Sequence, residues 1–310
     1  MKKAVHFDAG KIVRGFIADL LHDSGYEITF ADVVQETVAQ LQQDHSYVLF
    51  RIDHDYDEKI IDHVSAYSSI TEAEEIIATI DAADVLTTSV MASNLTKVAP
   101  LVAKGLKKRL SNKRPHMIVM ACEKPIMGTD ILKRAMVACG EITEEEFDQA
   151  AVYRNTAVDR MVFDGVHHGK EGVEIGDAYE LVIERQKLDD PDSTPIKGAE
   201  YVDDLAMYLQ RKIYIINCGR AVSAYLGQRH GLATVQDVLR TPDLLDEVKE
   251  AVLESAAALE KRYGFTHASL VDYIERMMVQ RFTTPGVSDS VLRVGRSRIF
   301  ESILREYQKA

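Results

Sequence analysis

The sequence predicts an α/β protein in which a parallel-sheet domain is followed by an all-helical domain. Three observations support this fold class. Strand-like apolar runs and amphipathic helical stretches alternate through the first 185 residues, as in parallel sheets covered by helices. Residues 186–198, rich in Pro, Asp, Ser and Thr, then interrupt the pattern and predict a surface connection. Beyond them the strand signal stops, and helical periodicity continues with short breaks.

The stretch 4–32 opens the sheet domain as a strand, a tight turn, a helix and a second strand. An apolar run at 5–7 leads into a small-residue turn, and the amphipathic stretch that follows is typical of a helix. The next apolar run ends at Asp32, about 20 residues beyond the turn. This spacing is typical of a Rossmann-like dinucleotide site, in which the pyrophosphate binds at the turn and the carboxylate accepts hydrogen bonds from the ribose hydroxyls. A parallel strand-helix-strand unit without a nucleotide remains the alternative.

The turn departs from the glycine pattern of dinucleotide sites. That pattern places small residues where this chain has Asp8, Gly10 and Val13, and only Gly10 complies. The charge of Asp8 would face the pyrophosphate, and the branched side chain of Val13 should hold the helix further from the strand. Three residues could offset part of this effect with cations and a bare backbone: Lys11, Arg14 and Gly15.

Further strands and helices follow in alternation. The strand predicted at 83–90 ends beside Thr88, at the edge where an open parallel sheet presents loops to a ligand. The candidate cofactor-binding residues are Asp8, Gly10, Lys11, Ile12, Asp32 and Thr88. The other predicted strands are 46–53, 59–69, 116–123, 156–163 and 174–185, and the predicted helices are 33–43, 71–82, 95–110, 129–138 and 143–153.

Length and composition limit the possible functions. A chain of 310 residues suffices for two domains, placed here at 1–195 and 196–310. The net charge of −12 argues against nucleic acid or an anionic membrane as partner. No targeting segment precedes the first strand, and no apolar run is long enough to cross a bilayer. The three cysteines, Cys122, Cys139 and Cys218, are typical of reduced thiols in a cytoplasmic protein and lack metal-site spacing.

Two histidine-containing segments are weak metal candidates. Crowded carboxylates such as those of the HDYDE segment at 54–58 are usually solvated rather than bound to a metal. The adjacent pair His167 and His168 lies in a glycine-rich loop, and neighbouring residues do not converge on one point. The sequence therefore predicts no metal site.

One helix of the second domain carries residues that a buried helix would normally exclude. From Ile213 onward the segment 203–227 is apolar nearly all round, so we expect it to be buried. It nevertheless contains Lys212, Asn217 and Arg220, together with an interior Gly219. Buried charges and amides are costly unless they have partners, which indicates that this helix lines a polar cleft. The alternative is that these side chains bond only to neighbouring carbonyl groups.

The three polar residues suit hydride transfer at an alcohol carbon. Such a reaction needs a group that takes the hydroxyl proton and a group that stabilises the developing alkoxide. A lysine desolvated beside another cation can be the base, which predicts this role for Lys212. An amide can donate to the oxyanion, which predicts that role for Asn217, and Arg220 lies three residues further on the same helix face.

Motifs across nearly the whole chain resemble those of the mannitol-1-phosphate 5-dehydrogenases, within the polyol-specific long-chain dehydrogenases. The resemblance implies an N-terminal Rossmann domain, a helical C-terminal domain, NAD(H) and no metal. It also implies interconversion of mannitol 1-phosphate with fructose 6-phosphate. The motifs are HFDAGKIVRGFIADLL, TFADV, DVLTTSV, MACE, NTAVDR, RKIYIINCGRAVSAYLG, KRYGF and RVGR.

The resemblance also assigns roles to single residues. Lys212 and Asn217 match the family's base and oxyanion donor, and Asp159 matches a substrate-site aspartate. Arg293 matches a family arginine, and Arg220 stands where the family has a histidine.

Other positions also depart from the family pattern. Lys124 replaces an asparagine and Glu301 a lysine, and the residues at 8 and 13 replace glycines. Arg220 cannot accept a proton at neutral pH, but it can bind a phosphate or an alkoxide through two N–H groups. Lys124 could likewise recruit an anionic substrate. Two hypotheses remain: a dehydrogenase with altered substrate preference, or a member without turnover that binds a sugar phosphate or a protein partner.

We therefore predict a cytoplasmic NAD-dependent oxidoreductase, monomeric or dimeric, that acts on a polyol phosphate or sugar phosphate. NAD is preferred because Asp32 would repel the 2′-phosphate of NADP and no arginine follows it. The predicted catalytic residues are Lys212, Asn217 and Arg220, and the predicted substrate-binding residues are Lys124, Asp159 and Arg293.

Overall fold

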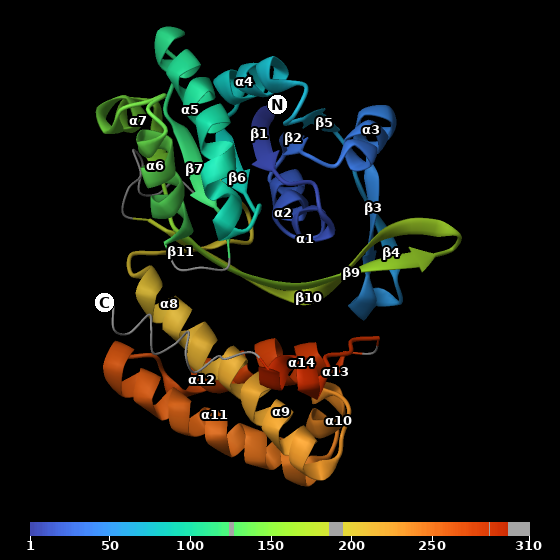
Figure 1. Cartoon of the computed structure of the whole chain (residues 1–310). Coiled ribbons are helices and arrows are strands. Elements are labelled where there is room, and N and C mark those ends of the chain that lie inside the picture. The colour runs from blue at the N-terminus through green and yellow to red at the C-terminus, as the bar shows by residue number, and fades with distance from the viewer. Residues whose placement is uncertain (124–126, 186–194, 285, 297–310) are drawn as a thin grey trace. The chain divides into compact units, whose positions relative to one another are not determined.

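The computed structural model describes residues 1–123, 127–185, 195–284 and 286–296 and divides into two compact units, 1–205 and 206–310 (Figure 1). The sequence placed the boundary at 195/196. The division falls later because residues after the connection still pair with the first unit: β11 (Glu200–Val202) lies parallel to the end of β10 (Lys170–Glu184). The connection itself, at 186–194, lies outside the described residues.

A six-stranded parallel sheet forms the centre of the first unit, with the order β5-β2-β1-β6-β7-β8. The chain builds outward from β1 through β2 to β5 and then returns to place β6 on the other side of β1. The strand order therefore reverses between β1 and β6, which is where open parallel sheets bind ligands. The strands are β1 (Lys2–Phe7), β2 (Tyr26–Asp32), β5 (Val64–Ser68), β6 (Val85–Thr88), β7 (Met117–Ala121) and β8 (Ala151–Tyr153).

Both faces of this sheet are covered, as predicted. On one face, Val5 and Phe7 pack into a buried cluster with the apolar sides of α4, α5, α6 and α7. On the other face, Ala4 and Ile28 pack with α1, α2, α3 and strands of a second sheet. The helices are α1 (Lys11–Arg14), α2 (Ile17–Asp23), α3 (Gln35–Asp44), α4 (Ala73–Ala82), α5 (Leu95–Ser111), α6 (Gly128–Ala138) and α7 (Glu144–Ala150), with short 3-10 turns η1 (Ile52–His54) and η2 (Ala92–Asn94).

The second sheet was not predicted as a separate layer. It contains β3 (Tyr47–Arg51), β4 (Asp57–Ile61), β9 (Thr156–His167), β10 and β11 in mixed orientation. The long β9–β10 hairpin runs past β3 and β4 in Figure 1. His168 and Gly169 connect its strands with left-handed backbone, φ 54° and 75°, as two-residue hairpin turns require.

Three elements differ from the sequence prediction. The run at 59–69 divides into β4 and β5, which belong to different sheets, and left-handed His63 (φ 55°) lies between them. The helix predicted at 143–153 ends at Ala150, and the last residues form β8 because they pair with β7. The strand signal was expected to stop at the connection, but the short β11 follows it.

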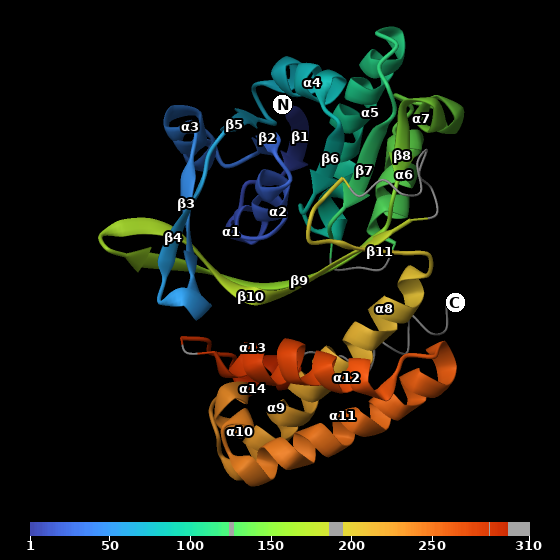
Figure 2. The same ribbon diagram turned by 180° about the vertical axis from the view of Figure 1, so that it is seen from behind.

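The described part of the second unit is helical, as predicted (Figure 2). Gly219 allows a close helix contact, since a Cβ there would lie 2.1 Å from the Met278 Sδ. The helix that contains Gly219 is buried on one side only, as the 60% exposure of Tyr225 shows. The prediction that this helix is buried on all sides was therefore wrong. None of the described helices combines the length and apolar character needed to cross a membrane. The helices are α8 (Leu205–Lys212), η3 (Ile213–Asn217), α9 (Cys218–His230), α10 (Val235–Leu239), α11 (Pro242–Tyr263), α12 (His267–Ile274), η4 (Glu275–Gln280), α13 (Arg281–Thr283) and α14 (Val291–Arg296).

Candidate active site

The turn after β1 is organised by the side chain of its first residue. Asp8 has a left-handed backbone (φ 99°), a conformation that glycine adopts freely and that aspartate tolerates better than most residues. Its backbone N–H donates to the Ala31 carbonyl at 2.9 Å. Its Oδ1 accepts the Gly10 N–H at 2.7 Å, so the carboxylate folds back over the turn.

The carboxylate of Asp32 is fixed at the end of β2. It is 8% exposed, and its oxygens accept the N–H groups of Ala9 at 2.5 Å and Val34 at 2.8 Å. A carboxylate has about four acceptor positions, so it can still accept hydroxyl groups of a ligand. Ile12, 54% exposed, follows the same turn and offers an apolar surface.

Three carboxyl groups come together at this edge of the sheet. Burial raises the pKa of Asp8 to about 6, the charges of Asp32 and Glu123 add to the rise, and the hydrogen bond from Gly10 opposes it. Burial also raises the pKa of Glu123, against hydrogen bonds from the Thr88 hydroxyl at 3.0 Å and the Val90 N–H. Glu123 was not predicted as a site residue, although its position at the carboxyl end of β7 was a signal for it.

The residues expected to offset the charge of Asp8 instead contact neighbouring strands. Lys11 forms an ion pair with Asp164 of β9. The Arg14 guanidinium lies 5.6 Å from the centre of the Tyr47 ring. A Cβ on Gly15 would lie 2.6 to 2.8 Å from branched side chains of β9 and β10, so this glycine allows the hairpin to approach.

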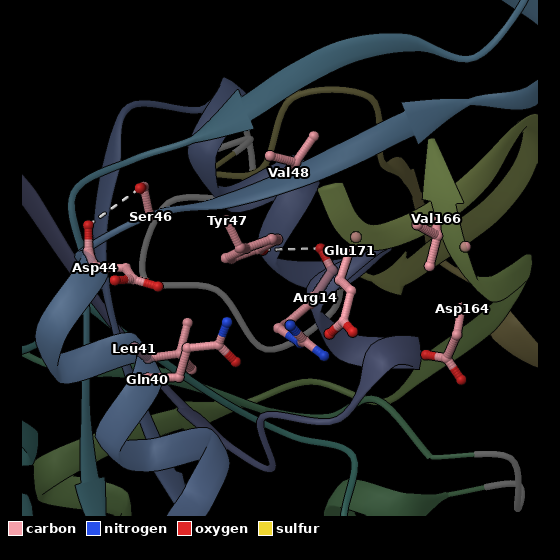
Figure 3. Close-up of a pocket in the computed structure, with 12 residues that line it drawn as sticks. Arg14, Gln40, Leu41, Asp44, Ser46, Tyr47, Val48, Asp164, Val166 and Glu171 are labelled. Atoms are coloured by element: carbon pink, nitrogen blue, oxygen red, sulfur yellow. Dashed lines mark hydrogen bonds between the residues drawn. The ribbon is translucent and has the colours of Figure 1, made fainter. Parts of the chain in front are cut away.

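A polar pocket of about 750 Å³ lies beside these contacts (Figure 3). Residues of α1, α3, β3 and the β9–β10 hairpin line it, and the Tyr47 hydroxyl at its wall donates to the Arg14 carbonyl at 2.8 Å. None of the predicted site residues is among its lining residues: Arg14, Gln40, Leu41, Asp44, Ser46, Tyr47, Val48, Asp164, Gly165, Val166, Glu171 and Gly172.

In the second unit, a π-helical turn brings Lys212 and Asn217 to one helix face. Between them η3 is wound with i→i+5 hydrogen bonding, seen in the Cys218 N–H donating to the Ile213 carbonyl. In an α-helix, residues five apart are rotated by roughly 140° from one another, whereas a π-turn brings them nearly into line. Arg220, three residues after Asn217 in α9, shares that face. The winding of the helix thus places the three predicted catalytic residues on one side of it, and their catalytic roles stay a prediction.

The Asn217 amide is available to a ligand. Its side chain is partly exposed, and within the described part of the chain it forms no hydrogen bond. Lys212, one π-turn earlier, is also partly exposed.

Arg220 and Arg293 converge on a carboxylate that sequence reasoning missed. Arg220 Nη2 lies 2.5 Å from Asp289 Oδ2, and Arg293 forms an ion pair with the other oxygen of the same group. The Asp289 side chain is 7% exposed, against 28% for Arg220 and 68% for Arg293. The signal that could have found Asp289 is its position four residues before Arg293, a spacing typical of helical ion pairs.

The remaining predicted residues lie elsewhere. Asp159 is on β9 in the first unit, opposite Glu180 of β10. Lys124 and Glu301 lie outside the described residues. Among the residues that the structure describes, no group of histidine, cysteine and carboxylate side chains is arranged to hold a metal ion.

Comparisons with known proteins agree with this architecture. Residues 2–194 match the model of the mannitol dehydrogenase Rossmann domain, and residues 204–302 match that of the mannitol dehydrogenase C-terminal domain. The mannitol-1-phosphate 5-dehydrogenase of Geobacillus stearothermophilus is 37% identical over 297 residues, covering 96% of this chain and 77% of that protein. Its counterpart from Sclerotinia sclerotiorum is 37% identical over 300 residues, covering 95% and 76%.

Solved structures show the same fold at lower identity. A D-sorbitol dehydrogenase in substrate-free form has a TM-score of 0.80 at 17% identity, covering 94% of this chain and 72% of that one. The Pseudomonas fluorescens mannitol 2-dehydrogenase, in a ternary complex with NAD and D-mannitol, has a TM-score of 0.73 at 18% identity, covering 94% and 71%. Since two domain models and relatives matched over most of their length agree, the chain belongs to the mannitol dehydrogenase family.

Proposed function

We propose that this protein is an NAD-dependent dehydrogenase that interconverts mannitol 1-phosphate and fructose 6-phosphate. Relatives matched over nearly the whole chain are mannitol-1-phosphate 5-dehydrogenases. The observation that carries the proposal is the π-turn, which presents Lys212 and Asn217 on one helix face. The comparisons give no support to the alternative of a member that binds without turnover.

The residues of the first unit fit a nicotinamide dinucleotide. Asp32 is held at the carboxyl end of β2 with acceptor positions left for the ribose hydroxyls, next to the point where the strand order reverses. Gly10, Lys11 and Ile12 would line the pyrophosphate and adenosine side, with Thr88 at the end of β6. The carboxylate of Asp32 would disfavour a 2′-phosphate, which supports NAD over NADP.

The helical unit supplies the groups that handle the proton and the oxygen. NAD, when bound, supplies the acceptor for the hydride. As the alcohol carbon of mannitol 1-phosphate becomes a carbonyl, the Lys212 amine takes the hydroxyl proton. The Asn217 amide donates a hydrogen bond to the oxygen as it gains negative charge. In the reduction of fructose 6-phosphate the same groups act in reverse, and Lys212 returns the proton.

The remaining assignments complete the proposal. Arg220 and Arg293 of the helical unit are proposed as substrate contacts, and Asp159 and Lys124 stay the predicted substrate-binding residues of the sheet unit. The protein acts in the cytoplasm as a monomer or dimer on a small-molecule substrate, without nucleic acid or membrane as partner.

Replacing Lys212 with Ala tests the proposed base. The rate of NADH oxidation with fructose 6-phosphate should fall by about 10²- to 10⁴-fold, the usual contribution of a general acid–base group. The Kd for NADH should stay within about twofold in a fluorescence titration, because the proposed cofactor-binding residues belong to the sheet unit.

The matched control is Lys249→Ala, which removes another partly buried lysine of the helical unit, one that pairs with Glu275 at 2.6 Å. Its rate should remain near that of the unmodified protein. An unchanged rate in Lys212→Ala would remove Lys212 from the mechanism.

A further inference from the structure

The geometry points to a phosphate-binding site made of Arg220 and Arg293, in which buried Asp289 acts as a positioning residue. The site would take the phosphate group of the polyol or sugar phosphate. This inference rests on the proposed function, because it gives the phosphate of that substrate a place in the helical unit.

Two cations share one carboxylate at this position. Arg220 contacts one oxygen of Asp289 and Arg293 the other, so the two guanidinium groups are held as neighbours. The cluster keeps one net positive charge after the carboxylate is counted. Within a chain of net charge −12, such a paired cation is a local attraction for a dianionic phosphate.

Asp289 is itself held in place by hydrogen bonds of its backbone to the start of α10. Its backbone N–H donates to the side-chain oxygen of Gln236 at 2.8 Å, and its carbonyl accepts the Val235 N–H at 2.9 Å. Gln236 is 1% exposed at the start of α10. The carboxylate therefore holds both arginines from a rigid part of the unit, as preorganised binding requires.

Both arginines keep donors for a ligand. A guanidinium has five N–H donors, and the Arg293 side chain is 68% exposed. The buried Nε of Arg220 has no hydrogen-bond partner among the described residues, so this guanidinium is incompletely satisfied as it stands. Phosphate oxygens are the acceptors that a pair of guanidinium groups matches best.

The distance from Lys212 suits a hexose phosphate. Arg220 lies eight residues further along the same run of helix, roughly 12 Å at 1.5 Å per residue. In fructose 6-phosphate about six bonds of roughly 1.5 Å separate the carbonyl carbon from phosphorus, a span of the same order. A histidine at this position would be mostly neutral near pH 7, whereas an arginine is always charged.

Kinetics with two substrates test the site. In Asp289→Asn and in Arg220→His, the KM for fructose 6-phosphate should rise by about 10- to 100-fold, the range expected for loss of charged hydrogen bonds. The rise in KM should be at least about tenfold larger with fructose 6-phosphate than with fructose, which has no phosphate group, and the Kd for NADH should change by less than about threefold. The exposed Arg276, paired with Asp272 four residues before it, gives the control Arg276→Ala, which should change none of these values.

Calorimetric titration of fructose 6-phosphate and of inorganic phosphate into the protein with NAD⁺, which has no hydride to give to fructose 6-phosphate, provides a readout that needs no turnover. Both variants should lose affinity for fructose 6-phosphate, and tighter binding of fructose 6-phosphate than of inorganic phosphate in the unmodified protein would identify the sugar ester as the ligand. Arg293→Lys, which keeps the charge and loses the paired N–H geometry, should weaken binding even if Asp289→Asn fails to fold.

The outcomes separate this inference from the proposed function. Unchanged KM and affinity in folded variants of a protein that turns over would overturn the phosphate site and leave the function standing. Equal losses with fructose and fructose 6-phosphate would also overturn it, because they indicate a general structural role. A protein without turnover that loses fructose 6-phosphate binding in both variants would support the phosphate site and contradict the function.

Discussion

Two regions of the chain gather charged groups of opposite sign, one at the turn after β1 and one in the helical unit. At the β1–α1 turn it places Asp8 beside Asp32 and Glu123, so a third carboxyl group joins two others. In the helical unit it places Arg220 beside Arg293, with Asp289 already between them. The cation Arg220 has a counter-ion in Asp289, whereas the groups that raise the pKa of Asp8 by their charge are themselves carboxylates.

The difference shows two ways in which a partly buried charged group is accommodated. Asp8 responds by holding its proton, since burial and the nearby carboxylates raise its pKa to about 6. Arg220 cannot lose its proton, so its charge is kept and paired. We therefore expect the sheet unit to bind an anionic cofactor in a pH-dependent way. Binding of the sugar phosphate in the helical unit should instead follow the charge of the phosphate group itself, whose second pKa is about 6.

After Lys212→Ala, the variant with the largest expected effect changes the helical region alone. Asn217→Ala removes the donor to the reacting oxygen and should lower kcat and kcat/KM together by about 10²- to 10³-fold. NADH affinity should not change in a fluorescence titration. Arg229→Ala, at the exposed end of the same helix, is the control, and a loss of rate as large in that variant would contradict a specific role for Asn217.

The next largest effect is expected from a variant that changes the sheet region alone. Asp32→Asn removes a carboxylate that accepts two backbone N–H groups, and the Kd for NADH should rise by about 10- to 100-fold. Discrimination against NADPH should fall in the same titration, because the charge that repels a 2′-phosphate is lost. The exposed Asp44→Asn is the control. A preserved NADH affinity in Asp32→Asn would place the ribose elsewhere.

A smaller effect, on the pH dependence of NADH binding, is expected from a substitution of Asp8. Asp8→Asn should bind NADH about tenfold more tightly than the unmodified protein at pH 8, because repulsion of a pyrophosphate by a carboxylate is worth about 1–2 kcal/mol after screening. At pH 5 the two proteins should bind alike, since a pKa of about 6 leaves Asp8 mostly protonated there. A difference that does not depend on pH would contradict this explanation.

The stability of the folded protein should also depend on the ionisation of Asp8. Its pKa is raised from 3.8 to about 6 in the folded protein, so protonation favours the native state. That contribution is fully present below pH 3.8 and is lost as the pH rises through 6. The melting temperature of Asp8→Asn relative to the unmodified protein should therefore increase between about pH 4 and 6 and then level off. A constant difference would count against ionisation of Asp8.

The sequence predicted the parallel sheet because apolar runs of strand length alternate with amphipathic stretches of helical length. It did not predict the second sheet, because periodicity identifies a strand but not its partner. The run at 59–69 shows this, since left-handed His63 divides it between two sheets. Lys11 and Gly15 likewise contact the β9–β10 hairpin, whereas the sequence had placed them in the cofactor-binding turn.

For the candidate site in the helical unit, the sequence indicated candidate residues but not their geometry. Lys212 and Asn217 stood out as polar residues in an apolar segment, yet five residues is the wrong spacing for one face of an α-helix. The π-turn that corrects this depends on tertiary packing and leaves no periodicity to detect. Asp289 was missed because a single aspartate in a polar loop looks like a solvated residue.

The central claim is that this chain binds NADH and transfers its hydride to a sugar phosphate. The most direct test is an NADH titration of the unmodified protein followed by the rate of NADH oxidation on addition of fructose 6-phosphate. We predict saturable NADH binding and NADH oxidation that requires fructose 6-phosphate and yields mannitol 1-phosphate. Saturable NADH binding with no oxidation on addition of fructose 6-phosphate would contradict the claim.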